Sequence, residues 1–198
     1  MKQYIKLGFL CFLLTSCVST KYSYTVDKQD PLNFSEGKWI LNTPYSNKNI
    51  KHISEIALKE FRSILGDSLI EINDLRSNFL VENKLPYEPT TSELKDLRIG
   101  TKCDYLINYK VTVLKNEIGS FSSPPPIGIA RKTNEALVEI LIYDLKSQTL
   151  LSKSSILGST EVELSDEDSG WDYVKTANVI ARGSLMRLIR KLYKNNIQ

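Results

Sequence analysis

The sequence predicts one α/β domain in which helices cover a mixed β-sheet. Three patterns of apolar residues predict it: helical spacing between residues 53 and 65, strict alternation between residues 105 and 113, and a stripe along a segment that ends near residue 193. The expected order of elements over residues 36–198 is β-α-β-α-β-β-β-α. An alternation of strands and helices followed by three consecutive strands is typical of a single layered domain.

The first strand is expected at Lys38–Thr43, where an apolar run ends at Pro44. A helix should follow, and Gly66 stands where a helix C-terminus often takes a left-handed residue. Alternating apolar positions within Ser68–Leu75 predict a second strand, which should pair in parallel with the first through a right-handed crossover. The inward face of the helix should consist of Ile53, Ile56, Ala57, Phe61, Ile64 and Leu65.

A second helix is expected from Thr90 to about Thr101, because Thr90 and Glu93 have the spacing of a capping box. The strand that follows has the strictest alternation in the chain and should have one apolar and one mostly polar face. The inward residues of the helix should be Leu94, Leu97 and Ile99, and those of the strand Tyr105, Ile107, Tyr109, Val111 and Val113.

Glu117–Thr133 is rich in Gly, Ser and Pro and is expected to be a long loop. Asn134–Leu145 is apolar on both faces, which predicts a central strand, and a turn at residues 146–149 leads to its antiparallel partner at Leu150–Glu161. A long helix is expected at Trp171–Tyr193. Its buried stripe should consist of Val174, Ala177, Ile180, Ala181, Leu185, Leu188, Ile189 and Leu192.

The first seventeen residues have the layout of an export signal that ends in a cysteine. Lys2 and Lys6 precede an apolar run at residues 7–14, and Leu14 to Cys17 reads Leu-Thr-Ser-Cys. This run makes about 12 Å of helix, far less than the ~30 Å hydrocarbon core of a bilayer. The tetrapeptide resembles the lipobox of bacterial lipoproteins, which implies cleavage before Cys17 and acylation of that residue. A plain signal peptide is the alternative.

Acyl chains on Cys17 would anchor the protein to a membrane. Each buried CH₂ contributes about 0.8 kcal/mol, so that two or three chains make the attachment effectively permanent. By the sorting rule of such lipoproteins, Val18 in place of Asp favours the outer membrane, with the domain facing the periplasm. The predicted boundaries are 1–16 for the signal peptide, 17–35 for the lipidated cysteine and a flexible tether averaging roughly 23 Å, and 36–198 for the periplasmic domain.

Charge and cysteine content narrow the possible functions. Loss of Lys2 and Lys6 with the leader lowers the 26 basic residues to 24, against 23 acidic ones, so nucleic acid is not an expected partner. Cys11 leaves with the leader and Cys17 carries lipid, so Cys103 has no partner for an intramolecular disulfide. We expect Cys103 to be a buried hydrophobic residue, with a reactive thiol as the alternative.

Two segments resemble a known family. Leu97–Val111 reads as a helix that leads through a turn into a strand, and residues 137–151 read as a strand, a turn and a return strand. Both are similar to the corresponding steps in CsgG-, LpoB- and TolB-N-like periplasmic proteins. Here Ser147–Thr149 replaces the family's usual Thr-Gly turn, and Asn108-Tyr109 replaces a glycine.

The resemblance implies that the protein is not an enzyme and needs no cofactor. Members of that family activate cell-wall synthases, form secretion pores or support envelope assemblies. It therefore implies a membrane-anchored scaffold, regulator or assembly factor that works through contacts with other envelope proteins. Two alternatives stay open: an oligomeric accessory component of secretion or transport, and a glycan-binding or hydrolytic periplasmic protein. The sequence does not fix the oligomeric state.

Few residues qualify as candidates for a metal or catalytic site. His52 is the sole histidine and is expected at the surface, and the chain has no Gly-rich phosphate loop, HExxH or CxxC motif. Asp166, Asp168 and Asp172 form a weak resemblance to a calcium loop. The alternative is that these acidic residues stabilise the N-terminus of the last helix.

Two further segments are candidates for binding a ligand or partner. Ser123 precedes Pro124, Pro125 and Pro126, and three prolines preorganise an extended helix that aromatic grooves can bind; a plain surface loop is the alternative. The last helix ends in a basic cluster that either complements the helix dipole or contacts anionic lipid or glycan. This cluster consists of Arg187, Arg190, Lys191 and Lys194.

Overall fold

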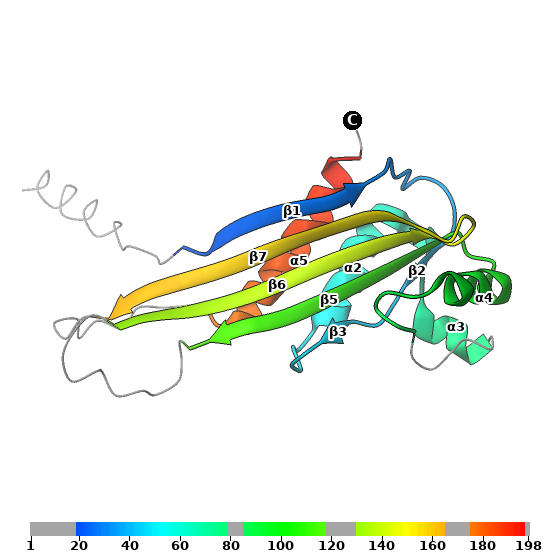
Figure 1. Ribbon diagram of the computed structural model, residues 1–198. Helices are drawn as coiled ribbons and strands as arrows, with labels where there is room; N and C mark the ends of the chain where they lie inside the picture. Colours follow the sequence, from blue (N-terminus) through cyan, green and yellow to red (C-terminus); the bar gives the residue numbers. More distant parts are fainter. Residues whose placement is uncertain (1–18, 79–84, 118–129, 165–174, 197–198) are drawn as a thin grey trace, which may run out of the picture.

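The structure is a computed structural model that describes residues 19–78, 85–117, 130–164 and 175–196. These residues form one seven-stranded sheet in the order β1-β7-β6-β5-β2-β4, with β3 paired to β5. Helices lie against both of its faces (Figure 1). The predicted α/β class and mixed sheet are therefore confirmed. Within the described ranges, no helix is both long and apolar enough to cross a bilayer.

The three longest strands form the predicted antiparallel meander. They are β5 (Tyr105–Asn116), β6 (Ala130–Asp144) and β7 (Thr149–Leu164). The expected loop at Glu117–Thr133 is too long, because β6 already begins at Ala130. There its backbone pairs with the end of β7, and this pairing needs no apolar side chains.

The parallel half of the sheet is built around β2 (Trp39–Leu41), which pairs with both β4 (Leu69–Glu71) and β5. Between β2 and β4, the chain forms β3 (Tyr45–Ser46), α2 (Ile53–Leu65) and a short 3₁₀ turn, η1 (Gly66–Ser68). The predicted βαβ unit is thus confirmed.

The prediction of a second strand at Ser68–Leu75 is correct up to Glu71 and wrong for the residues that follow. The chain leaves the sheet after Glu71 and forms α3 (Ile72–Asn78). Ile72 and Leu75 are both buried in the same apolar cluster. A spacing of three residues places them on one face of a helix, whereas in a strand they would point to opposite faces.

The two faces of the sheet carry separate apolar clusters. On one face, α2 and α5 (Ala177–Lys194) cover a large core that includes Trp39, Phe61 and Tyr109. On the other face, α3 and α4 (Thr91–Thr101) cover a smaller cluster near the start of β5 (Figure 1). Leu106 belongs to this second cluster and Asn108 is also fully buried, so the mostly polar face predicted for this strand is covered, and not open to solvent, over its first half.

The capping box of α4 is confirmed. The Thr90 N–H donates to Glu93 Oε2 at 2.6 Å, and the Glu93 N–H donates to Thr90 Oγ1 at 3.3 Å. Leu94 and Leu97 are buried as predicted, but Ile99 is 66% exposed. Ile99 is two positions from Leu97, which places it on a different side of the helix.

The last helix begins later than predicted. Thr176 is its N-cap in an extended conformation, so α5 starts at Ala177 rather than at Trp171. Residues 165–174, including Val174, lie outside the described residues. The remainder of the predicted stripe is confirmed as buried: Ala177, Ile180, Ala181, Leu185, Leu188, Ile189 and Leu192.

The prediction of a flexible tether over residues 17–35 is wrong for most of its length. Lys21–Gln29 forms β1, an edge strand antiparallel to β7. Farther along, Leu32 and Phe34 are buried in the main core. The Leu32 N–H also donates to Asn196 Oδ1 at 3.1 Å. The segment is ordered because these contacts bury apolar surface and satisfy backbone groups, although most of its residues are polar.

The position of α5 depends on Gly158 in β7. A Cβ atom at this residue would lie 2.6 Å from both Ile180 Cγ2 and Ser184 Oγ. Any side chain at position 158 would therefore push the helix away from the sheet. The absence of that side chain lets α5 approach the strand closely.

We predict that Gly158→Ala lowers the free energy of unfolding by about 1–3 kcal/mol, the usual cost of inserting a methyl group into a packed core. The control is Gly100→Ala in α4, where an added Cβ meets no atom within 4 Å. That change should stabilise the protein by about 0.5–1 kcal/mol, because alanine favours the helix. Urea denaturation measures the free energy of unfolding of both variants. Equal effects of the two substitutions would contradict the proposed packing constraint.

Candidate functional site

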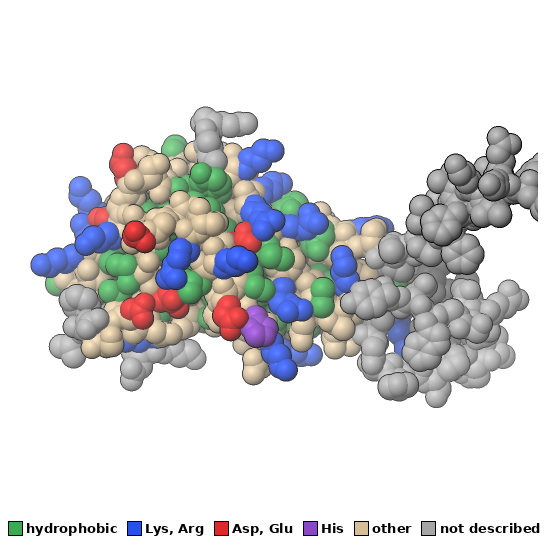
Figure 2. All heavy atoms as spheres, turned by 180° about the vertical axis from the view of Figure 1, so that it is seen from behind, with side chains coloured by type: hydrophobic (Ala, Val, Ile, Leu, Met, Phe, Trp, Pro, Cys, Tyr) green, Lys and Arg blue, Asp and Glu red, His purple; other side chains and the backbone are tan. Residues whose placement is uncertain are grey.

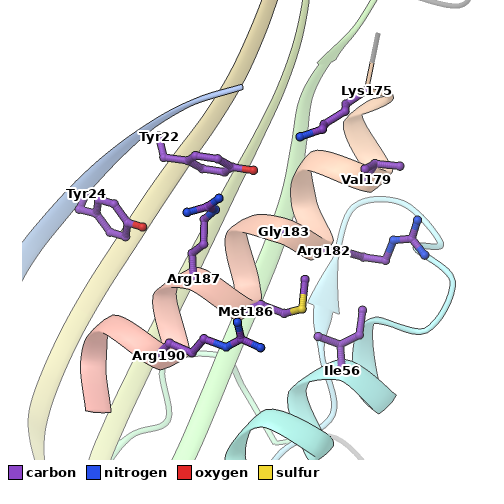
Figure 3. Close-up of a pocket in the computed structure, with 10 residues that line it drawn as sticks. All are labelled: Tyr22, Tyr24, Ile56, Lys175, Val179, Arg182, Gly183, Met186, Arg187 and Arg190. Atoms are coloured by element: carbon purple, nitrogen blue, oxygen red, sulfur yellow. The ribbon is translucent and has the colours of Figure 1, made fainter. Parts of the chain in front are cut away.

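An open groove runs between β1 and the exposed side of α5 and reaches α2 at one rim (Figure 3). Its cavity volume is about 590 Å³. We call it the basic groove. Its lining combines two tyrosines, four basic residues and a small or apolar remainder: Tyr22 and Tyr24; Lys175, Arg182, Arg187 and Arg190; Ile56, Val179, Gly183 and Met186.

The tyrosines come from β1, where Tyr22 and Tyr24 are two residues apart and therefore share one face of the strand. Tyr22 is paired with Gly158 of β7. Its hydroxyl oxygen would lie 3.0 Å from a Cβ at Gly183 of α5. Two residues without side chains thus leave room for the Tyr22 ring between the sheet and the helix, and Figure 3 shows this ring pointing toward α5.

Two cations of α5 lie over these rings. The Arg187 guanidinium carbon is 4.5 Å from the centroid of the Tyr22 ring, and Lys191 Nζ is 3.7 Å from that of Tyr24. Cation–π attraction favours both positions. The Tyr22 ring therefore holds Arg187 in a fixed place on the wall of the groove, and the Tyr24 ring holds Lys191 beside the groove.

Arg190 is the one groove cation with a carboxylate partner among the described residues. Its Nε and Nη2 donate to Glu60 Oε2 and Oε1, each at 2.8 Å. Glu60 raises the pKa of Arg190 through these hydrogen bonds and its charge. The Glu60 side chain is only 12% exposed and that of Arg190 is 67% exposed, so the pair joins α5 to α2 and compensates the charge of Arg190 at the rim of the groove.

The other groove cations have no such partner. In the described part of the chain, no carboxylate lies within ion-pair distance of Lys175, Arg182 or Arg187. The sequence of α5 contains five basic residues and no Asp or Glu. Like charges three or four positions apart repel one another, so this composition destabilises the helix slightly and creates a positive potential. Figure 2 shows Lys and Arg side chains spread over this helical face.

The groove has the chemistry of an anion-binding site. Guanidinium and ammonium groups donate charge-assisted hydrogen bonds to carboxylates and phosphates, and the tyrosine rings offer flat apolar surface. Across the described residues, no three His, Cys, Asp or Glu side chains are grouped as a metal site requires. His52 lies at the surface as predicted, just before α2, and its Nδ1 is 2.8 Å from Glu55 Oε2.

Cys103 is buried as predicted, with 1% of its surface exposed, and its thiol is free. Burial raises the pKa of this thiol. The reduced thiolate fraction and the covered sulfur make Cys103 a poor nucleophile. The structure therefore favours the packing role over the reactive thiol.

Several predicted site residues lie outside the described residues. These are the lipidation site Cys17, the partner-binding candidates Ser123, Pro124, Pro125 and Pro126, and the weak metal candidates Asp166, Asp168 and Asp172. The first turn of α5 itself contains no acidic residue, and the interpretation that these aspartates stabilise the start of the last helix stays a prediction.

The basic cluster at the C-terminal end of the last helix has mixed roles. Lys191 and Lys194 lie in the last turn of α5, as predicted. Arg187 belongs instead to the groove, and Arg190 pairs with Glu60. The helix dipole therefore accounts for only part of the cluster.

Sequence reasoning did not find Tyr22, Tyr24 or Arg182 as site residues. A signal for the tyrosines was present, because Tyr22, Tyr24 and Val26 alternate with polar residues as in a half-buried strand. The absence of acidic residues throughout the last helix was a second signal, since the chain as a whole is almost balanced in charge.

No protein-family model matches the chain, and no curated protein matches it by sequence. Several solved structures are similar at low identity. A PelC dodecamer from Paraburkholderia phytofirmans is 12% identical, with 88% of this chain and 98% of that chain covered and a TM-score of 0.49. The hypothetical protein CT253 from Chlamydia trachomatis is 10% identical, with coverage of 81% and 95% and a TM-score of 0.40.

Lipoprotein GNA1162 from Neisseria meningitidis is 12% identical, with 80% of this chain and 96% of that chain covered and a TM-score of 0.32. A protein described as a lipoprotein is thus among the structures similar to this chain. Likeness at this level assigns the chain to no family and transfers no activity or assembly to it.

We predict that Cys103 in the native protein reacts with a thiol reagent such as DTNB many-fold more slowly than in the unfolded chain. Burial covers the sulfur and raises the pKa of the thiol, which lowers the reactive thiolate fraction. The measurement uses Cys17→Ser protein from which the leader has been removed, in buffer and in guanidinium chloride. Equal rates in the two conditions would show that the thiol is accessible.

Proposed function

We propose that this protein is a lipid-anchored accessory protein of the bacterial cell envelope that acts by binding an anionic ligand, not by catalysis. The observation that carries this proposal is the basic groove, in which Lys175, Arg182 and Arg187 have no carboxylate partner among the described residues. An anionic ligand would compensate these charges. Of the roles considered from sequence, the geometry favours a ligand-binding role over one based on protein contacts alone.

The composition of the groove supports binding rather than reaction. Its described lining contains Tyr, Lys and Arg but no Asp, Glu, His or Cys. General acid–base catalysis near neutral pH uses groups that titrate there. Lysine and arginine side chains supply positive charge and hydrogen-bond donors, which suit the binding of an anion.

The proposed anchor lies close to the groove in the chain. Cys17 is four residues before Lys21, where β1 begins, and four residues span at most about 14 Å. Because β1 itself forms one wall of the groove, acyl chains on Cys17 would hold the site near the bilayer surface. The protein would then meet its ligand close to the membrane, in this proposal the outer membrane.

The free edge of β1 supports a second candidate function, that of an oligomeric component of secretion or transport. Among the described strands, β1 pairs only with β7, so its other edge is open to an extended segment of another chain. Sedimentation of the Cys17→Ser protein tests this function. Assembly that increases with concentration would favour it, and a monomer at every concentration would exclude it.

We predict that Cys17→Ser abolishes incorporation of labelled palmitate and moves the protein from the membrane to the soluble fraction. The reason is that the thioether and its acyl chains can no longer form. Cys11→Ser is the matched control, because Cys11 lies in the proposed leader and should be dispensable. Continued labelling and membrane attachment of the Cys17→Ser protein would overturn the proposed anchor.

A further inference from the structure

We propose that the basic groove binds one chain of an acidic polysaccharide. In this arrangement, sugar rings lie against Tyr22 and Tyr24, and sugar carboxylates bind Lys175, Arg182 and Arg187. This inference rests on the proposed function and names the chemical class of the ligand.

The arrangement of the charges favours an elongated anion. The three cations are Lys175, Arg182 and Arg187: the helical rise from Ala177 to Arg187 is about 15 Å, and Lys175 lies two residues before the start of α5. A small anion such as phosphate would reach only one or two of these groups. A polymer with a carboxylate on each repeating unit would reach the whole row, so its charge complements the groove along its length.

The tyrosines favour a sugar over a flexible acidic peptide. Tyr22 and Tyr24 are two residues apart on β1, which separates them by about 7 Å along the strand. Their positions are fixed by contact with the main core and by the cations that lie over the rings. Because Arg187 and Lys191 lie over these rings, apolar contact with neighbouring sugar rings comes from the part of each tyrosine that lines the groove, while Tyr and Arg hydrogen-bond to the sugar hydroxyls.

The packing of α5 disfavours a bilayer as the occupant. The apolar stripe of this helix, including Ile180, Leu185 and Leu188, is buried against the sheet and is not free to enter a membrane. The large apolar side chains that are exposed in the described structure are Val26, Ile99, Leu114 and Tyr193, and none of them lines the groove. The cations also line a concave surface, whereas a bilayer presents a flat one.

The test measures binding of a polygalacturonate oligomer to the native lipidated protein in neutral detergent, by isothermal titration calorimetry. The same oligomer with its carboxyl groups methyl-esterified is the matched ligand without charge. We expect binding of the acidic oligomer that weakens as salt screens the charges. We expect at least about tenfold weaker binding of the ester, because charge-assisted hydrogen bonds are lost.

Two sets of variants locate the binding. The triple variant Lys175→Gln/Arg182→Gln/Arg187→Gln should bind at least about tenfold more weakly. The double variant Tyr22→Leu/Tyr24→Leu keeps apolar contact with the core but removes the aromatic rings. Its affinity for the oligomer should also fall about tenfold. The charge-matched control consists of three exposed lysines at the opposite end of the sheet, and its affinity should not change: Lys38→Gln, Lys95→Gln and Lys146→Gln.

Circular dichroism and thermal melts confirm that each variant is folded before affinity is compared. Absence of polygalacturonate binding, or equal affinities of the triple variant and its control, would overturn the inference. Phosphatidylglycerol vesicles and polyglutamate serve as competing probes with the Cys17→Ser protein. If the groove variants lose binding to one of these probes while polygalacturonate does not bind, the polysaccharide inference fails, but the proposed anion-binding function stands.

Discussion

The close contact between α5 and β7 at Gly158 is the constraint on which the rest of the structure depends. It brings Ile180 and Ser184 against the strand and lets the helix cover the longest part of the sheet. The lack of a side chain at Gly158 also leaves room for the ring of Tyr22, which lies on the neighbouring strand β1. Core packing and groove shape therefore have a common origin in one residue without a side chain.

The helix that this contact positions has two different faces. Its apolar stripe completes the main core, and its opposite side carries basic residues with no acidic residue among them. The structure uses Glu60 to compensate Arg190, and two tyrosine rings to hold Arg187 and Lys191. Of the three cations proposed to bind the ligand, Arg187 is held in this way and keeps its charge uncompensated, so its side chain has little freedom left to lose on binding.

Elements with their own periodicity could be predicted from the sequence. This holds for helix α2, for the apolar stripe of α5 and for the meander of β5, β6 and β7. Each of these elements buries a regular set of apolar residues, and this pattern can be recognised within a short stretch of sequence. Strand β1 was missed because its order comes from pairing with β7, which is far along the chain, and from partial burial of two tyrosines in an otherwise polar segment. The short β4 and α3 could not be separated because the alternation of apolar positions in β4 continues to Ile72, the first residue of α3.

The candidate site was predictable only in part for the same reason. The basic residues near the end of the last helix could be identified as a possible contact for anionic lipid or glycan. The groove itself needs β1 to lie beside α5, and this placement depends on Gly158 and Gly183. Similarly, the burial of Asn108 in β5 depends on Asn42, whose Nδ2 donates to Asn108 Oδ1 at 2.9 Å, and on the backbone carbonyls of residues 86 and 87, to which Asn108 Nδ2 donates. Such tertiary contacts leave no periodic signal.

The antiparallel pairing of β1 with β7 has a mechanical consequence. If the protein is anchored through Cys17, a force on the anchor pulls β1 roughly along its own axis, parallel to the strand to which it is bonded. The ladder between the two strands is then loaded in shear, so that many of its hydrogen bonds resist together instead of opening one after another. A domain anchored in this way resists a pulling force that a ligand bound in the groove exerts on it, without a long linker to the membrane.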